Sequence, residues 1–336
     1  MITIHDVARK ANVSPSTVSR VINHNSSISE ATTKKVMMAI DQLGYEPNIL
    51  ARNFRKKETR ILLVLIPNIT NPYYSHILSG ISDTARDLGY SSFICNTQGN
   101  EQQEKDALDM LAKKRADGAI LLATEPGSHW LAKNRGKYPL VQCSEFDPNI
   151  PIPHVCIDNY QAACDVVEFL LQLGHQRIGT ISSKNKYMST RHRLDGYRDT
   201  LEKAGLPLRE DYIYYASEDY SFESGKEGAH LLMSLSEPPT ALFCISDMLA
   251  QGAVLGIQEM GLSVPGDVNV IGFDDVDQTT RYHPYVTTMA QPCYEIGQKA
   301  TQLLCTLIEE NGNIKDKPLK YILPHQLIER ETTKPK

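Results

Sequence analysis

Apolar residues recur at helical spacing at the very start of the chain. Ile4, Val7, Ala8 and Ala11 fall at i, i+3, i+4 and i+7 and predict one face of a short helix. Ser14 and Pro15 then predict the start of a second helix, because a serine hydroxyl caps an unpaired backbone N–H and proline is tolerated in the first turn. The apolar face of this second helix consists of Val18, Val21 and Ile22. Two short helices with a tight turn between them predict a helix-turn-helix.

The second helix leaves polar side chains on its outer face. These are Ser16, Thr17, Ser19, Arg20 and Asn23. Their hydrogen-bonding groups suit base edges and phosphates in a DNA groove. The alternative is a small helical subdomain with a solvated polar face. The cap, the helical period and the polar face together favour a DNA-binding helix.

A third helix is predicted between two terminal signals. Ser29 is a favoured N-cap, and Gly44 is a favoured stop just beyond the last apolar residue. This helix is expected to close a small core over the first two. The resulting domain, residues 1–46, is small for independent stability and depends on attachment or DNA.

Residues 47–60 are expected to form a linker. Pro47 bars continuation of the preceding helix, and a short basic helix is predicted over 49–55. Leu50 and Phe54 form an apolar pair on it, beside Arg52. A charged linker is usually a solvated hinge, but architectural proteins insert such apolar side chains into the minor groove while cations contact phosphates.

From Ile61 onward apolar strand-length runs alternate with helical patterns. Strands are predicted over 61–66, 91–96, 119–123, 155–157, 178–182, 241–245 and 268–273. Helices are predicted over 73–88, 102–114, 160–173, 248–260 and 294–310, with a further helix after Arg191. This alternation is typical of a parallel α/β sheet.

A weak internal repeat suggests that the α/β part has two similar lobes. Gly80 and Gly89 match Gly196 and Gly205 in spacing, and an Asp-Thr pair lies between the glycines of each copy. Each copy ends a predicted helix in front of a strand. Two lobes joined by crossovers leave a cleft, which is where a small ligand would bind.

Charge is distributed unevenly along the 336 residues, which carry a net charge of −5. Residues 1–60 contain ten Lys/Arg and five Asp/Glu, so they carry +5 and leave −10 for the remainder. A basic head on an acidic body is typical of a nucleic-acid-binding module attached to another domain.

The seven cysteines are scattered and form no C-x-x-C pair, so reduced thiols are expected rather than disulfides or a zinc site. The chain begins in a charged amphipathic helix without a signal peptide, and no apolar run approaches a membrane span. A cytoplasmic location without a membrane partner is therefore expected.

No enzymatic motif is found in the sequence. It lacks a P-loop, a G-x-G-x-x-G after a strand, H-E-x-x-H and G-x-S-x-G. Asp274 and Asp275 could be imagined as metal ligands, but adjacent residues at a strand end point to opposite sides. No enzyme, cofactor or metal site is therefore expected. A solute-binding protein that serves a transporter is the alternative from another class, and the basic helix-turn-helix argues against it.

Several polar and aromatic residues follow predicted strands or begin predicted helices. Tyr73 and Tyr74 could stack on a planar ring, and Asp247 and Asp274 could accept hydrogen bonds from hydroxyls. Core packing or helix capping is an equally good interpretation of each residue alone, above all of Asp247. Taken together they favour a polar, neutral, partly planar ligand.

Segments along nearly the whole chain resemble those of a known family. The matching stretches include TIHDVARKANVSPSTVSRVIN, YEPNILAR, NPYYSHILSGI, HRLDGY, ISDMLAQGA, VNVIGFDD and TTMAQP. In their order and spacing the chain resembles a LacI/GalR-type transcriptional regulator. It is most similar to the cytidine-repressor subgroup, through EFDPNIPIPHVCIDN, PPTALFCISD and AQPCYEIGQKA. The resemblance implies a helix-turn-helix headpiece (1–46), a hinge (47–60) and a two-lobed periplasmic-binding-protein-like α/β core (61–336).

The resemblance also implies a homodimer that binds a near-palindromic double-stranded DNA operator. The DNA-binding residues that it implies are Thr3, Pro15, Ser16, Thr17, Arg20, Asn23, Arg52 and Phe54. Pro15, Ser16 and Arg20 occupy base-reading positions. Phe54 stands where many members carry a leucine that wedges into the minor groove, so the usual kink is not assured here.

For the effector, the resemblance implies a set of cleft residues. They are Tyr73, Tyr74, Phe146, Arg193, Tyr220, Asp247, Asp274 and Gln291. The subgroup favours a nucleoside, with a tyrosine stacked on the base and with Arg193 and Asp274 on the ribose hydroxyls. A sugar effector is the alternative. The short charged tail lacks the leucine heptads that would support a tetramer.

Overall fold

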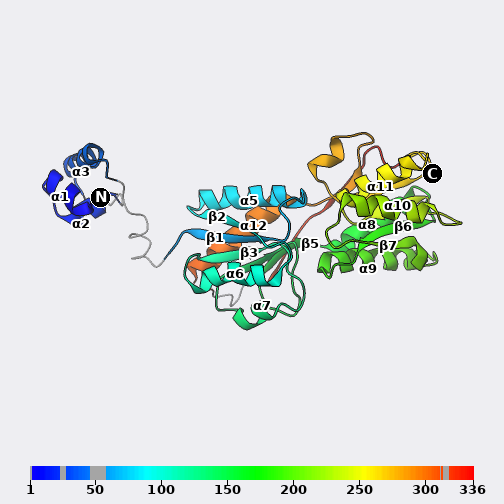
Figure 1. Cartoon of the computed structure of the whole chain (residues 1–336), viewed down its shortest axis with the longest axis horizontal. Coiled ribbons are helices and arrows are strands. Elements are labelled where there is room, and N and C mark those ends of the chain that lie inside the picture. Colours follow the sequence, from blue (N-terminus) through cyan, green and yellow to red (C-terminus); the bar gives the residue numbers. More distant parts are fainter. Residues whose placement is uncertain (1, 23–27, 46–57, 311, 313–317) are drawn as a thin grey trace. The chain divides into compact units, whose positions relative to one another are not determined.

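The structure is a computed structural model that describes residues 2–22, 28–45, 58–310, 312 and 318–336 (Figure 1). The chain divides into two compact units, Met1–Thr59 and Arg60–Lys336. We call the first unit the headpiece and the second the core. The expected basic helix over 49–55 lies outside the described residues, and so do Asn23, Arg52 and Phe54.

The headpiece contains the three helices that the sequence predicts. They are α1 (Ile4–Ala11), α2 (Pro15–Ile22) and α3 (Glu30–Leu43). The Oγ of Ser14 accepts a hydrogen bond from the N–H of Thr17 at 3.1 Å, and Gly44 ends α3 with φ of +58°. The three helices bury a common core of Val7, Ala8, Val18, Val21 and Val36.

The core consists of two lobes, each with a six-stranded sheet. The strands of lobe 1 are β1 (Ile61–Ile66), β2 (Ser91–Asn96), β3 (Gly118–Leu121), β4 (Leu140–Cys143), β5 (His154–Ile157) and β11 (Lys320–Leu323). Its helices are α5 (Tyr73–Asp87), α6 (Glu101–Ala112), α7 (His129–Asn134) and α12 (Cys293–Glu309). The helices α5 and α12 cover one face of this sheet, and α6 and α7 cover the other (Figure 1).

Lobe 2 has the same architecture. Its strands are β6 (Ile178–Ser183), β7 (Ile213–Ala216), β8 (Ala241–Cys244), β9 (Asn269–Asp274), β10 (Thr287–Ala290) and β12 (Gln326–Ile328). Its helices are α8 (Asn159–Gln172), α9 (Met188–Lys203), α10 (Phe222–Met233) and α11 (Asp247–Glu259), with short 3-10 turns at Glu210–Tyr212 and Asp277–Thr280. Within the described residues only the β10–β12 pairing is antiparallel.

The strand order explains where a ligand can bind. Lobe 1 has the order β11-β5-β4-β3-β1-β2, and lobe 2 has the order β12-β10-β9-β8-β6-β7. In each lobe the first strand therefore has its two successors on opposite sides. Such a topological switch point opens a crevice at the carboxyl ends of the strands. The two switch points are at β1/β3 in lobe 1 and at β6/β8 in lobe 2.

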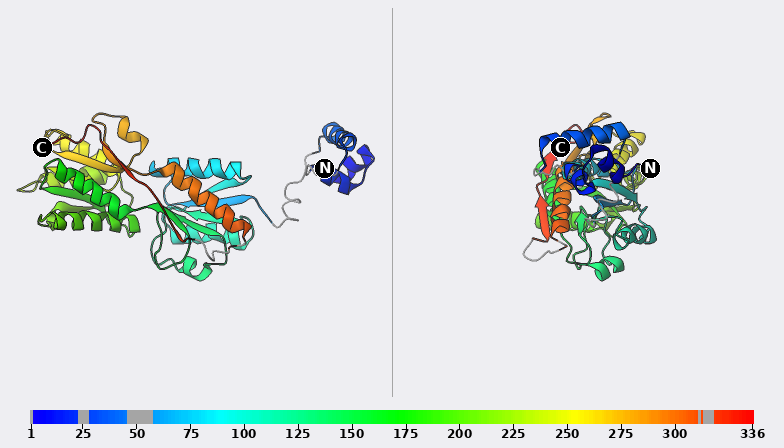
Figure 2. Two further views of the ribbon diagram at one scale, coloured as in Figure 1. Left: turned by 180° about the vertical axis from the view of Figure 1, so that it is seen from behind. Right: turned by 90° about the vertical axis from the view of Figure 1, so that its left-hand side faces the viewer.

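The chain passes between the lobes at three crossovers (Figure 2). The first, at Asp158, joins β5 to α8. The second, at Gln291 and Pro292, joins β10 to α12, and the third, at Pro324 and His325, joins β11 to β12. These short segments are the covalent hinges of the core.

The two copies of the internal repeat lie in corresponding helices, α5 and α9, each in front of the second strand of its lobe. Gly80 of α5 lies so close to α12 that a Cβ there would collide with the carbonyl oxygen of Tyr294. Gly196 of α9 bears the same relation to the carbonyl oxygen of Tyr160 in α8. The prediction of two similar lobes is confirmed, and the repeat marks equivalent sites of close helix packing.

Some elements of the core are absent from the sequence prediction. These are α7, α10, β4, β7, β10, β11 and β12. None of the helices in the described ranges is both long and apolar enough to cross a membrane.

Candidate functional site

The start of α2 presents the polar side chains that the resemblance assigns to DNA. Ser16 and Arg20 are exposed, and Pro15 and Thr17 are half-buried. The Oγ of Ser14 lies 2.7 Å from the Oγ of Ser16 and 2.8 Å from the Oγ1 of Thr17, so these hydroxyls form one small network. Arg20 is thus the long cationic side chain on the outer face of this helix.

Thr3 is the N-cap of α1. Its backbone N–H donates to the Oδ2 of Asp6 at 3.0 Å, and its hydroxyl donates to the same atom at 2.7 Å. Thr3 therefore fixes the first turn of α1 whether or not it contacts DNA.

A pocket between the lobes contains most of the expected effector residues. Those that line it are Tyr73, Tyr74, Arg193, Tyr220, Asp274 and Gln291. Tyr73 and Tyr74 begin α5, Asp274 ends β9, and Gln291 lies on the second crossover. The pocket has a volume of about 30 Å³, which is small beside the roughly 150 Å³ of a cavity that holds benzene.

Arg193 of α9 is the central cation of this pocket and is only 5% exposed. Its Nε donates to the Oδ1 of Asn159 at 2.9 Å, and its Nη1 donates to the carbonyl oxygen of Ile245. The same Nη1 lies 3.6 Å from the Oδ1 of Asp274, and the guanidinium lies 3.6 Å from the ring centroid of Phe273. These contacts hold a desolvated guanidinium in one orientation.

Asp274 forms hydrogen bonds with side chains whose place a ligand hydroxyl could take. The Nε2 of Gln291 donates to its Oδ1 at 2.7 Å, and the hydroxyl of Tyr73 donates to the Oε1 of Gln291 at 3.4 Å. Asp274 has φ of +115° and Asp275 has φ of +58°. Strained backbone of this kind is often found at functional sites. Asp275 points away and pairs with Arg330 at 2.6 Å, as the sequence pattern predicts for adjacent residues.

The tyrosines supply aromatic surface and neutral hydroxyls. The rings of Tyr73 and Tyr74 meet edge to face, with centroids 5.2 Å apart and planes at 62°. Burial raises the pKa of both phenols well above the ordinary value. They therefore remain hydrogen-bond donors at neutral pH, and the hydroxyl of Tyr73 already donates to the Oγ of Ser144 at 2.9 Å.

Asp247 does not line the pocket, although the resemblance places it among the effector residues. It is 1% exposed at the first position of α11. Its Oδ1 accepts from the hydroxyl of Thr288 at 2.6 Å, and its Oδ2 accepts from the N–H of Val276 at 2.9 Å. Both carboxylate oxygens are therefore used to join α11 to β10 and to the loop after β9.

Phe146 also lies outside the pocket lining. Its ring stacks on the imidazole of His154, with centroids 4.1 Å apart and planes at 6°. The preceding residue, Glu145, lines the pocket instead.

Sequence reasoning missed several pocket residues: Asn71, Ser144, Glu145, Asn159, Tyr187, Ser189 and Ser246. Glu145 belongs to lobe 1, and one of its carboxylate oxygens accepts from the N–H of Ser189 of lobe 2 at 3.1 Å. It thus reaches across the cleft to the start of α9. The available signal was its position after a strand, but that strand, β4, was itself not predicted.

Burial of Glu145 makes core stability depend on pH. Burial raises its pKa from 4.5 to about 7, although Ser189 and Arg193 act in the opposite direction. The folded state therefore keeps a proton that the unfolded state loses between pH 4.5 and 7. The resulting penalty is absent below pH 4.5, grows as the pH rises, and is complete above pH 7. Burial likewise raises the pKa of Asp274 to about 6, in the same sense.

We therefore expect Glu145→Gln to reduce the fall in stability between pH 5 and pH 7.5. A shift of this size corresponds to at most about 3 kcal/mol. Urea unfolding of both proteins at the two pH values measures the effect. Glu202→Gln, an exposed change on α9, is the matched control and should leave the slope as in the wild type. An unchanged slope in the Glu145→Gln protein would contradict the assignment.

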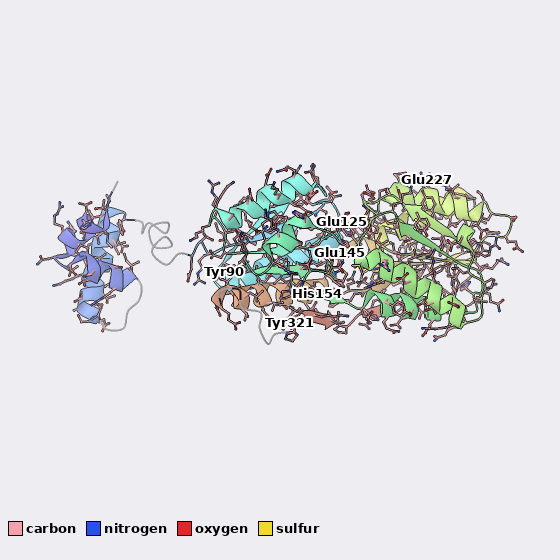
Figure 3. The ribbon with its side chains drawn as sticks, turned by 90° about the horizontal axis from the view of Figure 1, so that it is seen from below. Tyr90, Glu125, Glu145, His154, Glu227 and Tyr321 are labelled. Carbon is pink, nitrogen blue, oxygen red and sulfur yellow. The ribbon has the colours of Figure 1, made fainter. Side chains whose placement is uncertain are left out.

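The described residues contain no cluster of three or more His, Cys, Asp or Glu side chains suited to a metal ion. Figure 3 places Glu125 and Glu145 on the edge of lobe 1 that faces lobe 2. The chemistry that this edge supports is hydrogen bonding and aromatic stacking with an organic ligand.

Comparison with known proteins gives matches along the chain. The model described as bacterial regulatory proteins, lacI family, matches residues 3–48. The model described as periplasmic binding proteins and sugar binding domain of LacI family matches residues 59–331. The chain is 40% identical over 303 residues to the HTH-type transcriptional repressor CytR of Escherichia coli (strain K12), covering 90% of this chain and 88% of the relative.

Two solved structures agree with this result. One is the lac repressor dimer bound to operator and the anti-inducer ONPF, with a TM-score of 0.89, 28% identity and coverage of 99% of both chains. The other is a complex of the transcriptional regulator CelR with cellobiose, with a TM-score of 0.74, 26% identity and coverage of 99% of this chain and 100% of that chain. The chain therefore belongs to the LacI family of bacterial DNA-binding transcriptional regulators.

Proposed function

We propose that this chain is a homodimeric repressor whose affinity for a near-palindromic operator is controlled by a nucleoside bound between the lobes of the core. The observation that carries the proposal is one pocket in which aromatic rings face a buried guanidinium–carboxylate pair. A nucleoside presents the complementary groups, a planar base and a hydroxyl-bearing ring.

The pocket offers distinct partners for the two parts of a nucleoside. Tyr73, Tyr74 and Tyr220 provide ring faces and edges for the base. Arg193 and Asp274 provide a donor and an acceptor side by side, which suits a pair of ribose hydroxyls, and Gln291 supports Asp274. The resemblance to the cytidine-repressor subgroup favours cytidine within this class.

A sugar effector is the second candidate. The pairing of Arg193 with Asp274 suits adjacent hydroxyls of any carbohydrate, and the related CelR is described in complex with cellobiose. A sugar would use the tyrosines for stacking on its apolar face. The two candidates differ in whether a planar base is required for binding.

In the proposed complex with DNA, α2 lies in the major groove of each half-site. Pro15, Ser16 and Arg20 read bases, and Thr3, Thr17, Asn23 and Arg52 contact the backbone. Phe54 is proposed to approach the central minor groove from the hinge. This division assigns DNA recognition to residues 1–46, transmission to 47–60, and effector binding and dimerisation to 61–336.

Effector binding requires movement of the lobes. A nucleoside is many times larger than the cavity of about 30 Å³ that the closed pocket offers. Hydrogen bonds that bridge the lobes include those of Glu145 with Ser189 and of the Nε2 of His76 with the Oδ1 of Asp277 at 2.8 Å. We infer that these contacts break as the lobes separate about the three crossovers. The effector then shifts the population of lobe arrangements and so the operator affinity.

The direct test is a thermal-shift screen of the full chain against cytidine, other nucleosides, free cytosine, ribose and cellobiose. A ligand at about 100 times its Kd adds roughly 2.7 kcal/mol to the folded state. A shift with cytidine and not with the sugars supports the proposal. A shift with sugars alone would overturn the nucleoside assignment. Operator-binding titrations with and without the active ligand then establish whether it releases or promotes DNA binding.

An apolar hollow on lobe 2 is the proposed contact between the two copies. It has a volume of about 290 Å³ and is lined by α10, α11 and residues 278–286. Tyr282 at its rim is 77% exposed, and Leu255 is 37% exposed. Exposed apolar surface around a hollow is typical of a protein–protein contact, and an isologous dimer would place two such surfaces together.

We therefore expect Tyr282→Asp to convert the dimer to a monomer and to weaken operator binding strongly, because one headpiece loses the second half-site. Analytical ultracentrifugation and operator titration measure the two effects. Leu208→Asp, at a residue that is 42% exposed and does not line the hollow, is the control. A Tyr282→Asp protein that remains dimeric would exclude this surface as the dimer contact.

A further inference from the structure

A second and larger cavity opens at the switch point of lobe 1. Its volume is about 180 Å³, and it is lined by Pro67 after β1, Thr97 after β2 and Thr124 after β3. None of the expected effector residues lines it. Tyr187 of lobe 2 lines both this cavity and the pocket between the lobes. The cavity is therefore a separate compartment whose wall depends on lobe 2.

Carboxylates give this compartment an uncompensated negative charge. Glu101 and Glu104 of α6 and Glu125 after β3 line it, and its described lining contains no Lys, Arg or His. Burial, together with repulsion from Glu125 and Glu101, raises the pKa of Glu104 from 4.5 to about 7. Glu104 is half-buried, whereas Glu101 and Glu125 are exposed, and a cation bound among these carboxylates offsets their mutual repulsion.

A buried hydroxyl on the same wall also lacks a partner. Thr124 is 5% exposed, and its Oγ1 has no hydrogen-bond partner. Buried polar atoms are almost always satisfied in native proteins, so an exception at a cavity indicates a missing partner. Thr124 follows β3 at the switch point, where ligands of α/β sheets commonly bind.

One part of the wall is apolar and limits the size of the ligand. Leu65, Leu108, Leu121 and Leu131 line the cavity, and each is at most 5% exposed. A cavity of about 150 Å³ is known to accommodate benzene, so this volume suits a ligand of about six heavy atoms. The compartment thus combines a hydrocarbon wall with carboxylates.

An organic cation fits these walls better than a metal ion. No described cluster in the chain has the three or more donor side chains that hold a metal. A metal ion also has no use for the leucine wall, whereas an alkylammonium ion buries its chain there and directs its N–H groups to oxygen acceptors.

We propose that this compartment is a binding site for a small primary amine with an apolar chain. Its ammonium group lies between Glu104 and Glu125, and its chain contacts the leucines. Because Tyr187 forms part of the wall, the bound amine favours the closed arrangement of the lobes. This site does not depend on the effector being a nucleoside.

The test is isothermal titration of the full-length chain at neutral pH with n-pentylamine and with 1-pentanol, which has the same chain and no charge. We expect saturable binding of pentylamine at one site per chain, at least about tenfold tighter than that of pentanol. The double variant Glu104→Gln/Glu125→Gln should weaken pentylamine binding about tenfold or more and leave pentanol binding unchanged, because hydrogen bonds to charged groups are the strong ones.

Asp106→Asn is the matched control, because Asp106 is exposed on the same helix and does not line the cavity. It should bind pentylamine as the wild type does. Retained operator binding by the double variant shows that it is folded. Equal affinity of the wild type and the double variant for pentylamine, or equal affinity of the wild type for the amine and the alcohol, overturns the proposal. Cytidine titrated in the same samples reports on the interlobe pocket separately.

Discussion

Replacing Arg193 with alanine is expected to abolish the effector response and to lower the free energy of unfolding by about 3–5 kcal/mol. Arg193 is the cation that compensates the buried carboxylate of Asp274, at 3.6 Å, and it also attracts the negative charge of buried Glu145. Without it the pKa of Asp274 rises further above its present value of about 6, and the Oδ1 of Asn159 loses its donor. Effector-induced shifts in Tm and urea unfolding measure the two effects.

Arg191→Ala is the matched control for this prediction. Arg191 lies on the same helix, its side chain is 74% exposed, and its ion pair with Asp195 is 3.7 Å long. Exposed pairs of this kind contribute about 0–1 kcal/mol, so stability and ligand response should remain close to those of the wild type. If Arg193→Ala and Arg191→Ala behave alike, Arg193 is not the central cation of the effector pocket.

Arg193→Lys separates folding from recognition. Lysine keeps the positive charge beside Asp274 but lacks the planar set of donors that the guanidinium offers to several acceptors at once. We expect this variant to unfold closer to the wild type than Arg193→Ala does and still to lose most of its effector affinity. Full effector affinity in the lysine variant would reduce the role of Arg193 to its charge.

Replacing Arg20 with alanine is expected to remove sequence preference from operator binding. An arginine that donates two hydrogen bonds to a guanine contributes about 1–3 kcal/mol of discrimination. A dimer on a near-palindrome contains two such contacts, so the loss is about 2–6 kcal/mol on the operator and much smaller on random DNA. Titrations of both DNAs at fixed salt measure the difference, because phosphate contacts make every affinity salt-dependent.

Arg9→Ala is the corresponding control in the headpiece. Arg9 lies in the last turn of α1, is 82% exposed and has Asp6 at 3.9 Å. Its removal should weaken binding to both DNAs by a similar, small amount. Equal losses on operator and random DNA in the Arg20→Ala protein would show that Arg20 contacts phosphate and not bases.

The helices and strands that the sequence predicts are those with a sustained apolar pattern or with clear cap and stop residues. The helices α2 and α3 have caps or stops at Ser14, Ser29 and Gly44, and β1 is an uninterrupted apolar run with five of its six residues buried. The strands that sequence reasoning missed are three or four residues long, and although β3, β5 and β8 are equally short, most of the missed strands also contain a polar residue that interrupts the apolar run.

The missed helix α10 has a different explanation. Its sequence contains Gly225 and Gly228, and glycine lowers helix propensity. Tertiary packing requires them, because a Cβ on Gly225 would collide with the backbone of Leu249 in α11 and one on Gly228 would collide with the ring of Tyr214. Local propensity is overridden here by a close helix contact that no local pattern reveals.

The residues of the proposed effector pocket were predictable only where they stand at a helix start or a strand end. Tyr73 and Asp274 stand at a helix start and a strand end, which the sequence pattern reveals. The contribution of Glu145 depends on a contact to the other lobe, 44 residues further along the chain, at Ser189. Asp247 also stands at a helix start, but both of its carboxylate oxygens accept hydrogen bonds from Thr288 and Val276, so its position did not reveal whether it faces the pocket. Sequence position locates an edge of the sheet but not the direction of each side chain.

The three crossovers have a consequence for synthesis on the ribosome. Lobe 1 takes its strands β1–β5 from residues 61–157, but its helix α12 and its strand β11 come from residues 293–323. Lobe 2 is likewise incomplete until β12 (Gln326–Ile328) has been synthesised, and Thr332 of the tail is fully buried in this lobe. A ribosome therefore finishes nearly the whole chain before either lobe can close. A nascent chain that stops before residue 293 carries a complete headpiece but lacks α12 of lobe 1 and β12 of lobe 2, so the interlaced topology leaves both lobes incomplete until synthesis is nearly finished.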